Sequence, residues 1–224
     1  MNLVDQVIIC SAGTGSRLGL GLPKCLTSVE GRPLIHWQLE LLRDFEKVVI
    51  VVGFKAAQVV STVREFRPGA TFAMNHDFAT TTTLDSMLLA ADSLEGPFVY
   101  LDGDLLVTNE AIQDIASAPC PCIGIKRRYS EQPVCVTMRD GMVTGFTREP
   151  LEYEWTGLAK LDADRVGEAR GNQYVYHAVE KVLPVTPIEI DCVEVDTPQD
   201  LEEARKWMKE RTWSGSSGLN AASA

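Results

Sequence analysis

The stretch from residue 7 to residue 24, VIICSAGTGSRLGLGLPK, constrains the fold more than any other part of the chain. It opens with the apolar run Val-Ile-Ile, which is typical of a central strand in a parallel sheet. A glycine-rich loop follows, in which Gly13 and Gly15 have no Cβ to keep a ligand away from the backbone. Backbone amides in such a loop form a concave anion site, and Arg17 and Lys24 add positive charge to it. The stretch therefore predicts a buried strand and a loop that binds a triphosphate.

Two better-known phosphate motifs do not fit this loop. A P-loop requires Gly-Lys-Ser/Thr, whereas Pro23 precedes Lys24 and no hydroxyl residue follows it. A dinucleotide fingerprint requires a glycine three residues after Gly15, where the chain has Leu18, and an acid after the second strand, which residues 48–52 lack. Glycines alone are weak signals, because any tight turn from strand to helix favours them. The combination Gly-x-Gly-x-Arg, a short gap and Pro-Lys is far more specific.

The order of the predicted elements indicates an α/β fold. Helical spacing at residues 33–43 and 56–66 alternates with apolar strands at 48–52 and 70–74. Three β-α units in succession predict a parallel, doubly wound sheet. Further helices are expected at 84–94, 108–117, 172–183 and 198–209, and further strands at 98–101, 122–125, 134–138, 142–146, 155–161 and 188–195.

The length and charge of the chain narrow its organisation and its partners. Its 224 residues suit a single domain over residues 1–210, followed by a flexible tail or linker at 211–224. A net charge of −10 argues against a protein that binds nucleic acid or an anionic membrane surface. No apolar run approaches the ~20 residues of a membrane span, the N-terminus does not resemble a signal peptide, and the cysteines are scattered. We expect a cytoplasmic protein that binds a small anionic ligand together with a divalent metal.

Carboxylates follow two of the predicted strands. Asp102 and Asp104 come directly after the apolar strand 98–101, and Asp196 follows the strand 188–195. An Asp-Gly-Asp sequence can be a simple turn, but two carboxylates at the end of a central strand also suit a hard divalent cation that binds phosphate oxygens. Because Asp196 also lies at a strand end, just before a helix, it could reach the same metal from across the sheet.

Two further polar stretches have both a structural and a functional interpretation. Residues 75–86 contain four consecutive threonines before an apolar helix, and these form either a polar loop with an N-cap or a wall that contacts the base and the acceptor. Lys126 begins a run of three cations at the end of a strand. That run is either a solvated edge or a site for the phosphate of the acceptor.

Three blocks now stand in order along the chain: Gly13-x-Gly15-x-Arg17…Pro23-Lys24, Asp102-Gly-Asp104 and Glu194-Val-Asp196. Together they resemble the nucleotidyltransferase superfamily, which implies a Rossmann-like, GT-A-like α/β fold with a mostly parallel mixed sheet flanked by helices. The resemblance runs from about residue 7 to residue 205. Within the superfamily the chain is most similar to the bacterial choline-phosphate and phosphonate cytidylyltransferases, through VVGFK at 51–55 and through residues 75–86. In that family two asparagines usually stand where Thr82 and Thr83 stand here, which favours an acceptor other than phosphocholine.

The resemblance implies transfer of CMP from CTP to a small phosphonate or phosphorylated alcohol, with Mg2+ as cofactor and release of pyrophosphate. It implies catalytic roles for Lys24 and Arg17 and metal binding by Asp104 and Asp196. The nucleotide-binding residues that it implies are Ala12, Gly13, Thr14, Gly15, Ser16, Arg17, Lys24, Thr82, Thr83, Ser86 and Asp102. The acceptor-binding residues that it implies are Thr80, Asp85, Lys126 and Trp155. It implies no nucleic-acid or membrane partner, and leaves open a homodimer or a fusion to a further module.

Three other functions fit parts of the pattern. The first alternative is a sugar-1-phosphate nucleotidylyltransferase that uses UTP, dTTP or GTP, although such enzymes are often longer and carry a glutamine-containing base motif. A GT-A glycosyltransferase would share the Asp-x-Asp metal site but does not require a triphosphate loop. A regulatory nucleotide-binding module would not require Lys24, Asp104 and Asp196 together.

Overall fold

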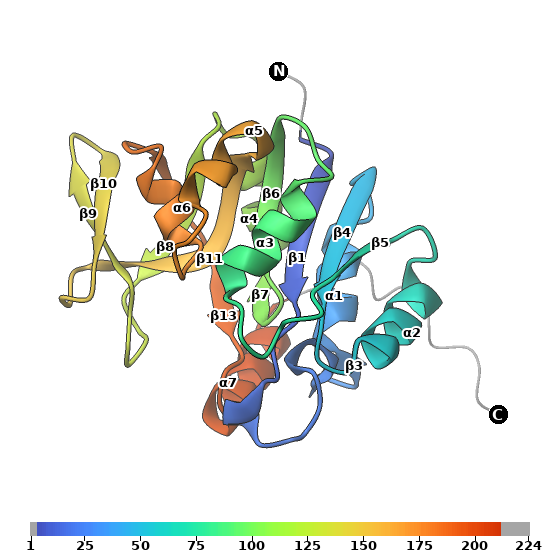
Figure 1. Cartoon of the computed structure of the whole chain (residues 1–224). Coiled ribbons are helices and arrows are strands. Elements are labelled where there is room, and N and C mark those ends of the chain that lie inside the picture. The colour runs from blue at the N-terminus through green and yellow to red at the C-terminus, as the bar shows by residue number, and fades with distance from the viewer. Residues whose placement is uncertain (1–3, 212–224) are drawn as a thin grey trace.

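The chain alternates strands and helices in its first half and adds a series of strands in its second half (Figure 1). The computed structural model describes residues 4–211. The strands are β1 Gln6–Ser11, β2 Ser28–Val29, β3 Arg32–Pro33, β4 Lys47–Val52, β5 Thr71–Met74, β6 Pro97–Asp102, β7 Leu105–Val107, β8 Cys122–Arg127, β9 Cys135–Arg139, β10 Met142–Thr147, β11 Tyr153–Asp162, β12 Thr186–Glu189 and β13 Cys192–Glu194. The α-helices are α1 Leu34–Leu41, α2 Ala56–Phe66, α3 Thr83–Ala91, α4 Asn109–Ser117, α5 Ala163–Val166, α6 Tyr176–Glu180 and α7 Pro198–Lys209.

The main sheet is mixed. Its strands follow the order β10-β9-β11-β6-β1-β4-β5, with β8 paired to β11 and β12 paired to β8. Strands β6, β1, β4 and β5 are parallel, and they contain the β-α units that the sequence predicts. Strand β11 is antiparallel to β6, β8 and β9, so the second half of the sheet departs from the parallel pattern. The predicted α/β fold with a mixed sheet between helices is confirmed.

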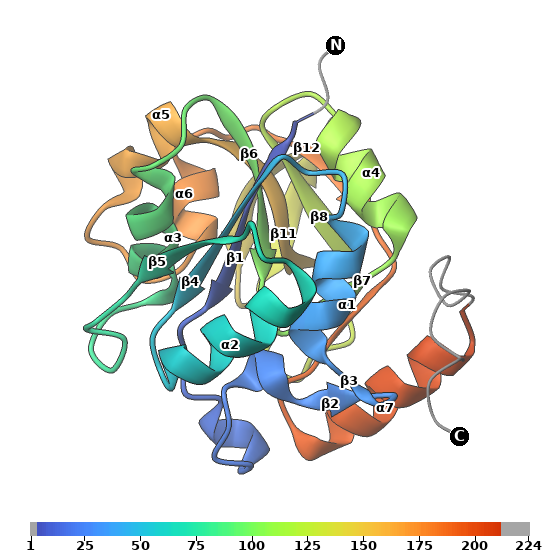
Figure 2. The same cartoon turned by 90° about the vertical axis from the view of Figure 1, so that its right-hand side faces the viewer.

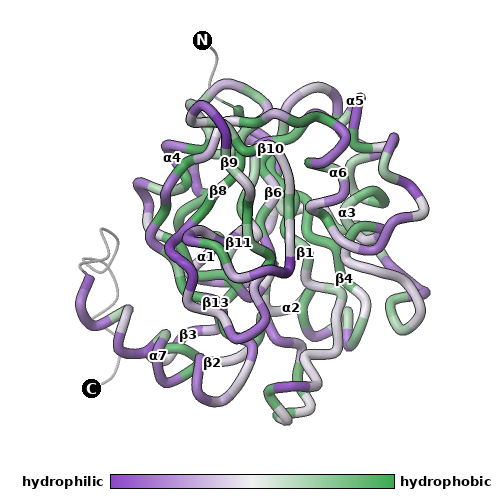
Figure 3. Tube along the Cα trace, turned by 90° about the vertical axis from the view of Figure 1, so that its left-hand side faces the viewer, coloured by the Kyte–Doolittle hydropathy of each residue, from purple (hydrophilic) through white to green (hydrophobic). Residues whose placement is uncertain are grey.

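Two apolar layers cover the two faces of the sheet. Alternate residues of β1 supply both layers: Val7 and Ile9 face α1, α2 and α4, whereas Ile8 faces α3, α5 and α6. Figure 2 shows α1 and α4 on one side of the sheet and α3, α5 and α6 on the other. Figure 3 shows that the hydrophobic segments concentrate in the central strands. Because β1 is buried on both faces, its C-terminal end is fixed in the middle of the sheet, where the glycine-rich loop begins.

A third, smaller apolar cluster attaches α7 to the glycine-rich loop. Leu18 of the loop packs with Leu106 of β7 and with Ala204 and Met208 of α7. Helix α7 has the predicted bounds and is amphipathic, with an apolar stripe against this cluster and charged residues outside. The last helix is therefore part of the framework of the loop that the sequence singles out.

The helix expected at residues 172–183 is wrong in extent. Only α6, Tyr176–Glu180, is helical in that segment. Gly171 has a φ of 86°, and the side-chain amide of Asn172 donates a hydrogen bond to the carbonyl of Ala169. Turn geometry therefore occupies the position of the expected first helical turn, because an asparagine side chain competes with the helix for backbone groups.

The strand expected at residues 188–195 is two strands in two different sheets. Strand β12 pairs with β8 in the main sheet, and β13 pairs with β7 in a two-stranded sheet. Between them, the amide of Ile190 donates to the carbonyl of Ile125, and Asp191 accepts hydrogen bonds from Trp207 and Arg211 of the α7 segment. The apolar run is continuous in sequence, yet these contacts turn the chain from one sheet to the next.

The expected tail at 211–224 lies outside the described residues except for Arg211. Among the described residues, no helix combines the length and the apolar character needed to cross a membrane. The assignment of residues 211–224 as a flexible tail or linker stays a prediction.

Substitution of Gly103 tests how closely β1 packs against the turn that follows β6. Its amide donates a hydrogen bond of 3.0 Å to the carbonyl of Cys10. A Cβ at this position would lie 2.4 Å from that carbonyl oxygen and from Ser11 Oγ, so Gly103→Ala forces the backbone apart. We expect a loss of about 1–3 kcal/mol of unfolding free energy, measured by urea denaturation. Gly69→Ala is the matched control because a Cβ there meets nothing within 4 Å, and equal stability of the two variants would contradict this packing.

Candidate functional site

Two short strands bring three acids to one place. Asp104 lies in the turn between β6 and β7, Glu194 ends β13, and Asp196 lies two residues later. Strands β7 and β13 pair antiparallel, with Glu194 opposite Leu105, and the amide of Val195 donates to the carbonyl of Asp104 over 2.9 Å. One carboxylate oxygen from each of Asp104, Glu194 and Asp196 lies within 4.8 Å of the others. We refer to these three residues as the acid cluster.

The start of helix α7 fixes Asp196. The carboxylate of Asp200 accepts hydrogen bonds from the amides of Asp196, at 3.1 Å, and Thr197, at 2.7 Å. The hydroxyl of Thr197 in turn accepts from the amide of Asp200, which completes a capping box. The backbone that carries Asp196 is therefore held by reciprocal hydrogen bonds.

The glycine-rich loop places its two cations on the acid cluster. Lys24 Nζ lies 2.5 Å from Asp104 Oδ2 and also pairs with Asp196. Arg17 pairs with the other carboxylate oxygen of Asp196. The side chain of Lys24 is 17% exposed and that of Arg17 is 70% exposed, so Lys24 is an inner partner of the acids and Arg17 an outer one. The structure thus joins the four residues for which the sequence predicts catalytic and metal-binding roles.

The shape of the loop depends on Gly15. Its φ is 61°, and a Cβ there would lie 3.1 Å from the Cβ of Lys24. A side chain at this position would therefore both strain the backbone and crowd Lys24. Of the predicted phosphate-binding residues, Ala12 is buried, whereas Gly13, Thr14 and Ser16 are exposed. Three of the predicted nucleotide-binding residues therefore lie on the surface of the loop.

The acid cluster carries more negative charge than its surroundings compensate. Burial, followed by the charges of Asp104 and Asp196, raises the pKa of Glu194 to about 7. Burial also raises the pKa of Asp102 well above its usual range, with a contribution from Asp104. Burial lowers the pKa of Lys24, but the ion pairs with Asp104 and Asp196 outweigh burial and raise it above its usual value. Lys24 stays charged, while the acids around it repel one another.

The acid cluster fits a hard divalent cation. Three carboxylates supply the oxygen donors that Mg2+ prefers, and they come from two chain segments that the backbone holds together. Because burial and the charges of Asp104 and Asp196 raise the pKa of Glu194, a cation at this point would favour its charged form. The donor set thus agrees with the predicted Mg2+ site, with Glu194 as a third acid beside Asp104 and Asp196.

The threonine-rich segment is organised partly by helix capping. Thr82 is the N-cap of α3, and its hydroxyl accepts from the amide of Asp85. The carboxylate of Asp85 accepts from the amide and the hydroxyl of Thr82, both at 2.8 Å. The structural interpretation of this stretch is correct for these two residues. A role for Thr82 or Asp85 toward a ligand stays a prediction, as it does for the exposed Thr80 and Thr83.

The buried side chain of Asn75 holds the same segment through hydrogen bonds. The side-chain amide of Asn75 donates to Thr81 Oγ1, at 2.8 Å, and to Ser86 Oγ, at 3.0 Å. Its oxygen accepts from the amide of Asp77. Ser86, which the sequence predicts to bind nucleotide, is buried and serves as a partner of Asn75. The segment between β5 and α3 is therefore fixed by its own hydrogen bonds.

Lys126 and Trp155 lie on neighbouring strands of the second half of the sheet. Lys126 Nζ is 3.5 Å from Glu154 Oε1, and the side chain of Glu154 is only 1% exposed. Glu154 also accepts hydrogen bonds from the amide and hydroxyl of Ser130. Trp155 contacts Phe146 edge to face, with 6.3 Å between ring centroids. Lys126 is close enough to the acid cluster that its charge also acts on Glu194, after the larger effects of burial and the aspartates.

Asp102 is packed beneath a glycine of β11. The hydroxyl of Tyr100 donates to one carboxylate oxygen of Asp102. Gly157 has a φ of 84°, and a Cβ there would lie 2.2 Å from the other oxygen. The carboxyl group is thus enclosed by Tyr100 and Gly157, and its predicted contact with nucleotide stays a prediction.

Sequence reasoning did not assign roles to Glu194, Glu154 or Asn75. Glu194 lies two positions before the expected metal ligand Asp196, on a strand that the sequence pattern presents as continuous. Glu154 and Asn75 are single polar residues at buried positions, 1% and 7% exposed. A buried polar residue at a strand end is the available signal, because such a group requires a partner inside the fold.

Comparison with known proteins agrees with this site. Residues 7–181 match the family described as MobA-like NTP transferase domain. One relative is CMP-5'-(3-aminopropyl)phosphonate synthase from Streptomyces rubellomurinus, which is 33% identical over 125 residues. That alignment covers 51% of this chain and 19% of the relative, so the chain spans less than a fifth of that relative's length.

Solved structures share the fold over nearly the whole chain. CTP:phosphocholine cytidylyltransferase from Streptococcus pneumoniae superposes with a TM-score of 0.79 at 20% identity, covering 92% of this chain and 100% of its own. UDP-glucose pyrophosphorylase from Acinetobacter baumanii superposes with a TM-score of 0.73 at 14% identity, covering 91% and 92%. At such identities the likeness concerns the fold. The sequence match over residues 7–181 carries the assignment: the chain belongs to the MobA-like NTP transferase family of nucleotidyltransferases.

Proposed function

We propose that this chain transfers CMP from CTP to a small phosphonate or phosphorylated alcohol and releases pyrophosphate, with Mg2+ as cofactor. The single observation that carries this proposal is the contact between the glycine-rich loop and the acid cluster. Lys24 reaches both Asp104 and Asp196, so a phosphate-binding loop and a cation-binding set of acids share one corner of the sheet. A nucleoside triphosphate with its metal requires both a phosphate-binding loop and a set of acids next to each other.

The residues of the chain perform complementary tasks in this reaction. The amides of Gly13–Gly15 and the side chain of Arg17 bind the β- and γ-phosphates, and Lys24 stabilises charge near the α-phosphate. Asp104, Glu194 and Asp196 would hold Mg2+, which supplies charge neutralisation on the α-phosphate and the leaving group when it is bound. An acceptor oxygen forms a bond to the α-phosphorus as the bond to pyrophosphate breaks. The acceptor oxygen is already an anion, so positioning rather than a general base carries the catalysis.

Two observations support CTP and a phosphonate. The relative with 33% identity is described as a CMP-phosphonate synthase, and its alignment covers half of this chain. Lys126, on a strand next to β11, offers a cation for the anionic head of the acceptor while Glu154 fixes its position. With Trp155 nearby on β11, this region supports an acceptor site beside the acid cluster.

A sugar-1-phosphate nucleotidylyltransferase that uses UTP, dTTP or GTP is the second candidate. The fold itself does not separate the two, because UDP-glucose pyrophosphorylase shares it. The acid cluster and the glycine-rich loop would serve either reaction equally.

An assay of pyrophosphate release with four NTPs and a panel of acceptors tests the proposal. We expect the highest kcat/KM with CTP, because a site that hydrogen-bonds one base leaves buried polar groups unpaired with another. We expect a higher kcat/KM with 2-aminoethylphosphonate or a hydroxyalkylphosphonate than with phosphocholine. The reason is that Thr82 and Thr83 stand where the choline-phosphate family usually has two asparagines. Equal or better rates with UTP or dTTP and a sugar 1-phosphate would establish the second candidate instead.

Metal dependence tests the acid cluster. We expect no turnover in EDTA, and Asp104→Asn and Asp196→Asn should each raise the Mg2+ concentration required for half-maximal rate, because each removes one anionic ligand. Asp92→Asn is the matched control, since Asp92 forms an exposed ion pair with Arg170 outside the cluster. Full activity in EDTA, or an equal shift in the control, would refute the assignment.

Lys24→Ala tests the inner cation of the loop. We expect a folded protein whose kcat/KM falls by ~10²-fold or more, as for loss of one electrostatic stabiliser. We also expect its melting temperature in EDTA to fall below that of the wild type, because Asp104 and Asp196 then lose their shared partner, and added Mg2+ should restore most of the difference. Lys209→Ala, at an exposed ion pair with Glu30, is the control for loss of a lysine. Near-normal turnover in folded Lys24→Ala would remove Lys24 from the mechanism.

A further inference from the structure

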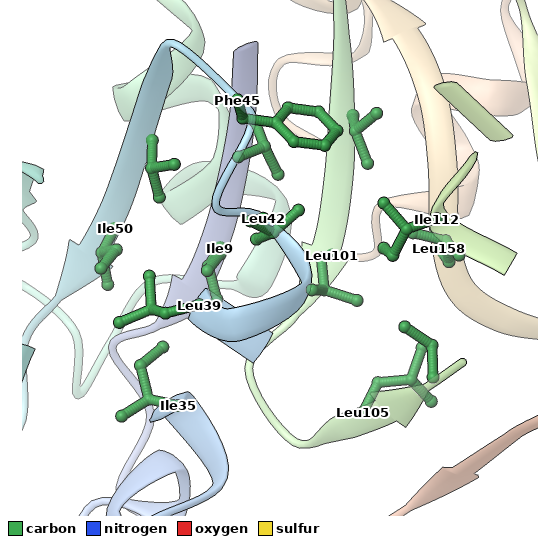
Figure 4. Packing of buried hydrophobic residues seen from close by; sticks show 14 of the residues in the cluster. Ile9, Ile35, Leu39, Leu42, Phe45, Ile50, Leu101, Leu105, Ile112 and Leu158 are labelled. Atoms are coloured by element: carbon green, nitrogen blue, oxygen red, sulfur yellow. The ribbon is translucent and has the colours of Figure 1, made fainter. Parts of the chain in front are cut away.

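Helix α1 carries a buried polar side chain that the proposed reaction does not use. Gln38 is 1% exposed and stands beside Leu39 on a helix that packs against the sheet. Figure 4 shows this helix close to Leu101 and Leu105, the apolar residues on either side of the turn between β6 and β7. A glutamine in such a layer is unusual because its amide loses its hydrogen bonds to water.

Both amide hydrogens of Gln38 are used on that turn. Nε2 donates to the carbonyl of Asp102 and to the carbonyl of Leu105, each at 2.8 Å. Both partners are acceptors, so only the NH2 group of the amide can face them. In the described part of the chain, Gln38 Oε1 is buried without a hydrogen-bond partner. The fold therefore tolerates an unsatisfied oxygen at this position in order to place two donors on the turn.

The two carbonyls flank Asp104. The same turn has two other backbone anchors, since the amide of Gly103 donates to Cys10 and the carbonyl of Asp104 accepts from Val195. Gln38 adds hydrogen bonds to the carbonyls of the first and last residues of the turn, Asp102 and Leu105. The direction of the Asp104 carboxylate depends on the backbone of this four-residue turn, because the side chain has only two rotatable bonds beyond it.

We propose that Gln38 is a positioning residue for the acid cluster: it fixes the Asp102–Leu105 turn so that the carboxylate of Asp104 stays in reach of Glu194 and Asp196. The proposal rests on the function proposed above, and it adds a group on helix α1 that acts on the metal ligand through the backbone. Without the two donors, the carbonyls of Asp102 and Leu105 have to find water or new partners, and the turn shifts. Metal affinity should fall, while the loop of Gly13–Gly15 is unaffected.

The test compares Gln38→Met, which keeps the length of the side chain without donors, with Gln38→Glu, which places an acceptor against two acceptors. Mn2+ is the probe, because it takes the same oxygen ligands as Mg2+ and its binding is read directly by electron paramagnetic resonance. We expect Mn2+ to bind each variant ~10–100-fold more weakly than the wild type, with and without CTP, as for loss of an outer-shell partner. Saturating Mg2+ should restore most of kcat, because the ligands themselves are intact.

Leu39→Ala is the control for general loosening of α1. Leu39 is also buried, at 1% exposure, and its truncation lowers stability by leaving a cavity while both hydrogen bonds from Gln38 to the turn remain possible. Its Mn2+ affinity should match that of the wild type at a similar loss of melting temperature. Unchanged Mn2+ affinity in a folded Gln38 variant, or an equal loss in Leu39→Ala, overturns the positioning role alone. No Mn2+ binding by the wild type, with or without CTP, overturns the metal site as well.

Discussion

Electrostatic repulsion within the acid cluster is the constraint on which the rest of the site depends. Asp104, Glu194 and Asp196 lie within 4.8 Å of one another at their carboxylate oxygens, and the pKa of Glu194 rises to about 7 through burial and its two neighbours. Such an arrangement persists only where the backbone enforces it and where cations offset it. Lys24 and Arg17 supply that offset from the glycine-rich loop. The loop for which the sequence predicts triphosphate binding is therefore held by the same acids that suit a metal.

The backbone enforces the cluster from three directions. The pairing of β7 with β13 joins Asp104 to the segment of Glu194, and the capping box of α7 holds Asp196. The third apolar cluster then ties α7 to Leu18 of the loop. The strand pairing and the apolar cluster join parts of the chain that are far apart in sequence, whereas the capping box is local. Helix α7 is thus a structural element of the site.

The parts of the fold that the sequence predicts are those with local signals. Apolar runs and helical spacing identify the β-α units, and the end of the parallel strand β6 locates Asp104. Asp196 follows β13, and the antiparallel pairing of β13 with β7 brings it to Asp104. The strand at 188–195 could not be divided from its pattern, since the break at Ile190 and Asp191 is made by contacts to β8 and α7. The helix at 172–183 failed because the side chain of Asn172 closes a turn instead.

The residues that sequence reasoning missed share a physical cause. Gln38, Glu154 and Asn75 are polar side chains at buried positions, and their partners lie on other elements: the β6–β7 turn, the end of β8 and the start of α3. A periodic pattern shows that such a residue is buried but does not show what it meets. A buried donor or acceptor must be paired, so each of these residues fixes a loop whose shape the sequence leaves open. The side chain of Asn75 forms hydrogen bonds with Asp77, Thr81 and Ser86. These bonds fix the backbone of the segment that carries the exposed Thr80 and Thr83. The sequence predicts that Thr80 and Thr83 contact the base or the acceptor, and neither side chain is among the hydrogen-bond partners of the Asn75 amide.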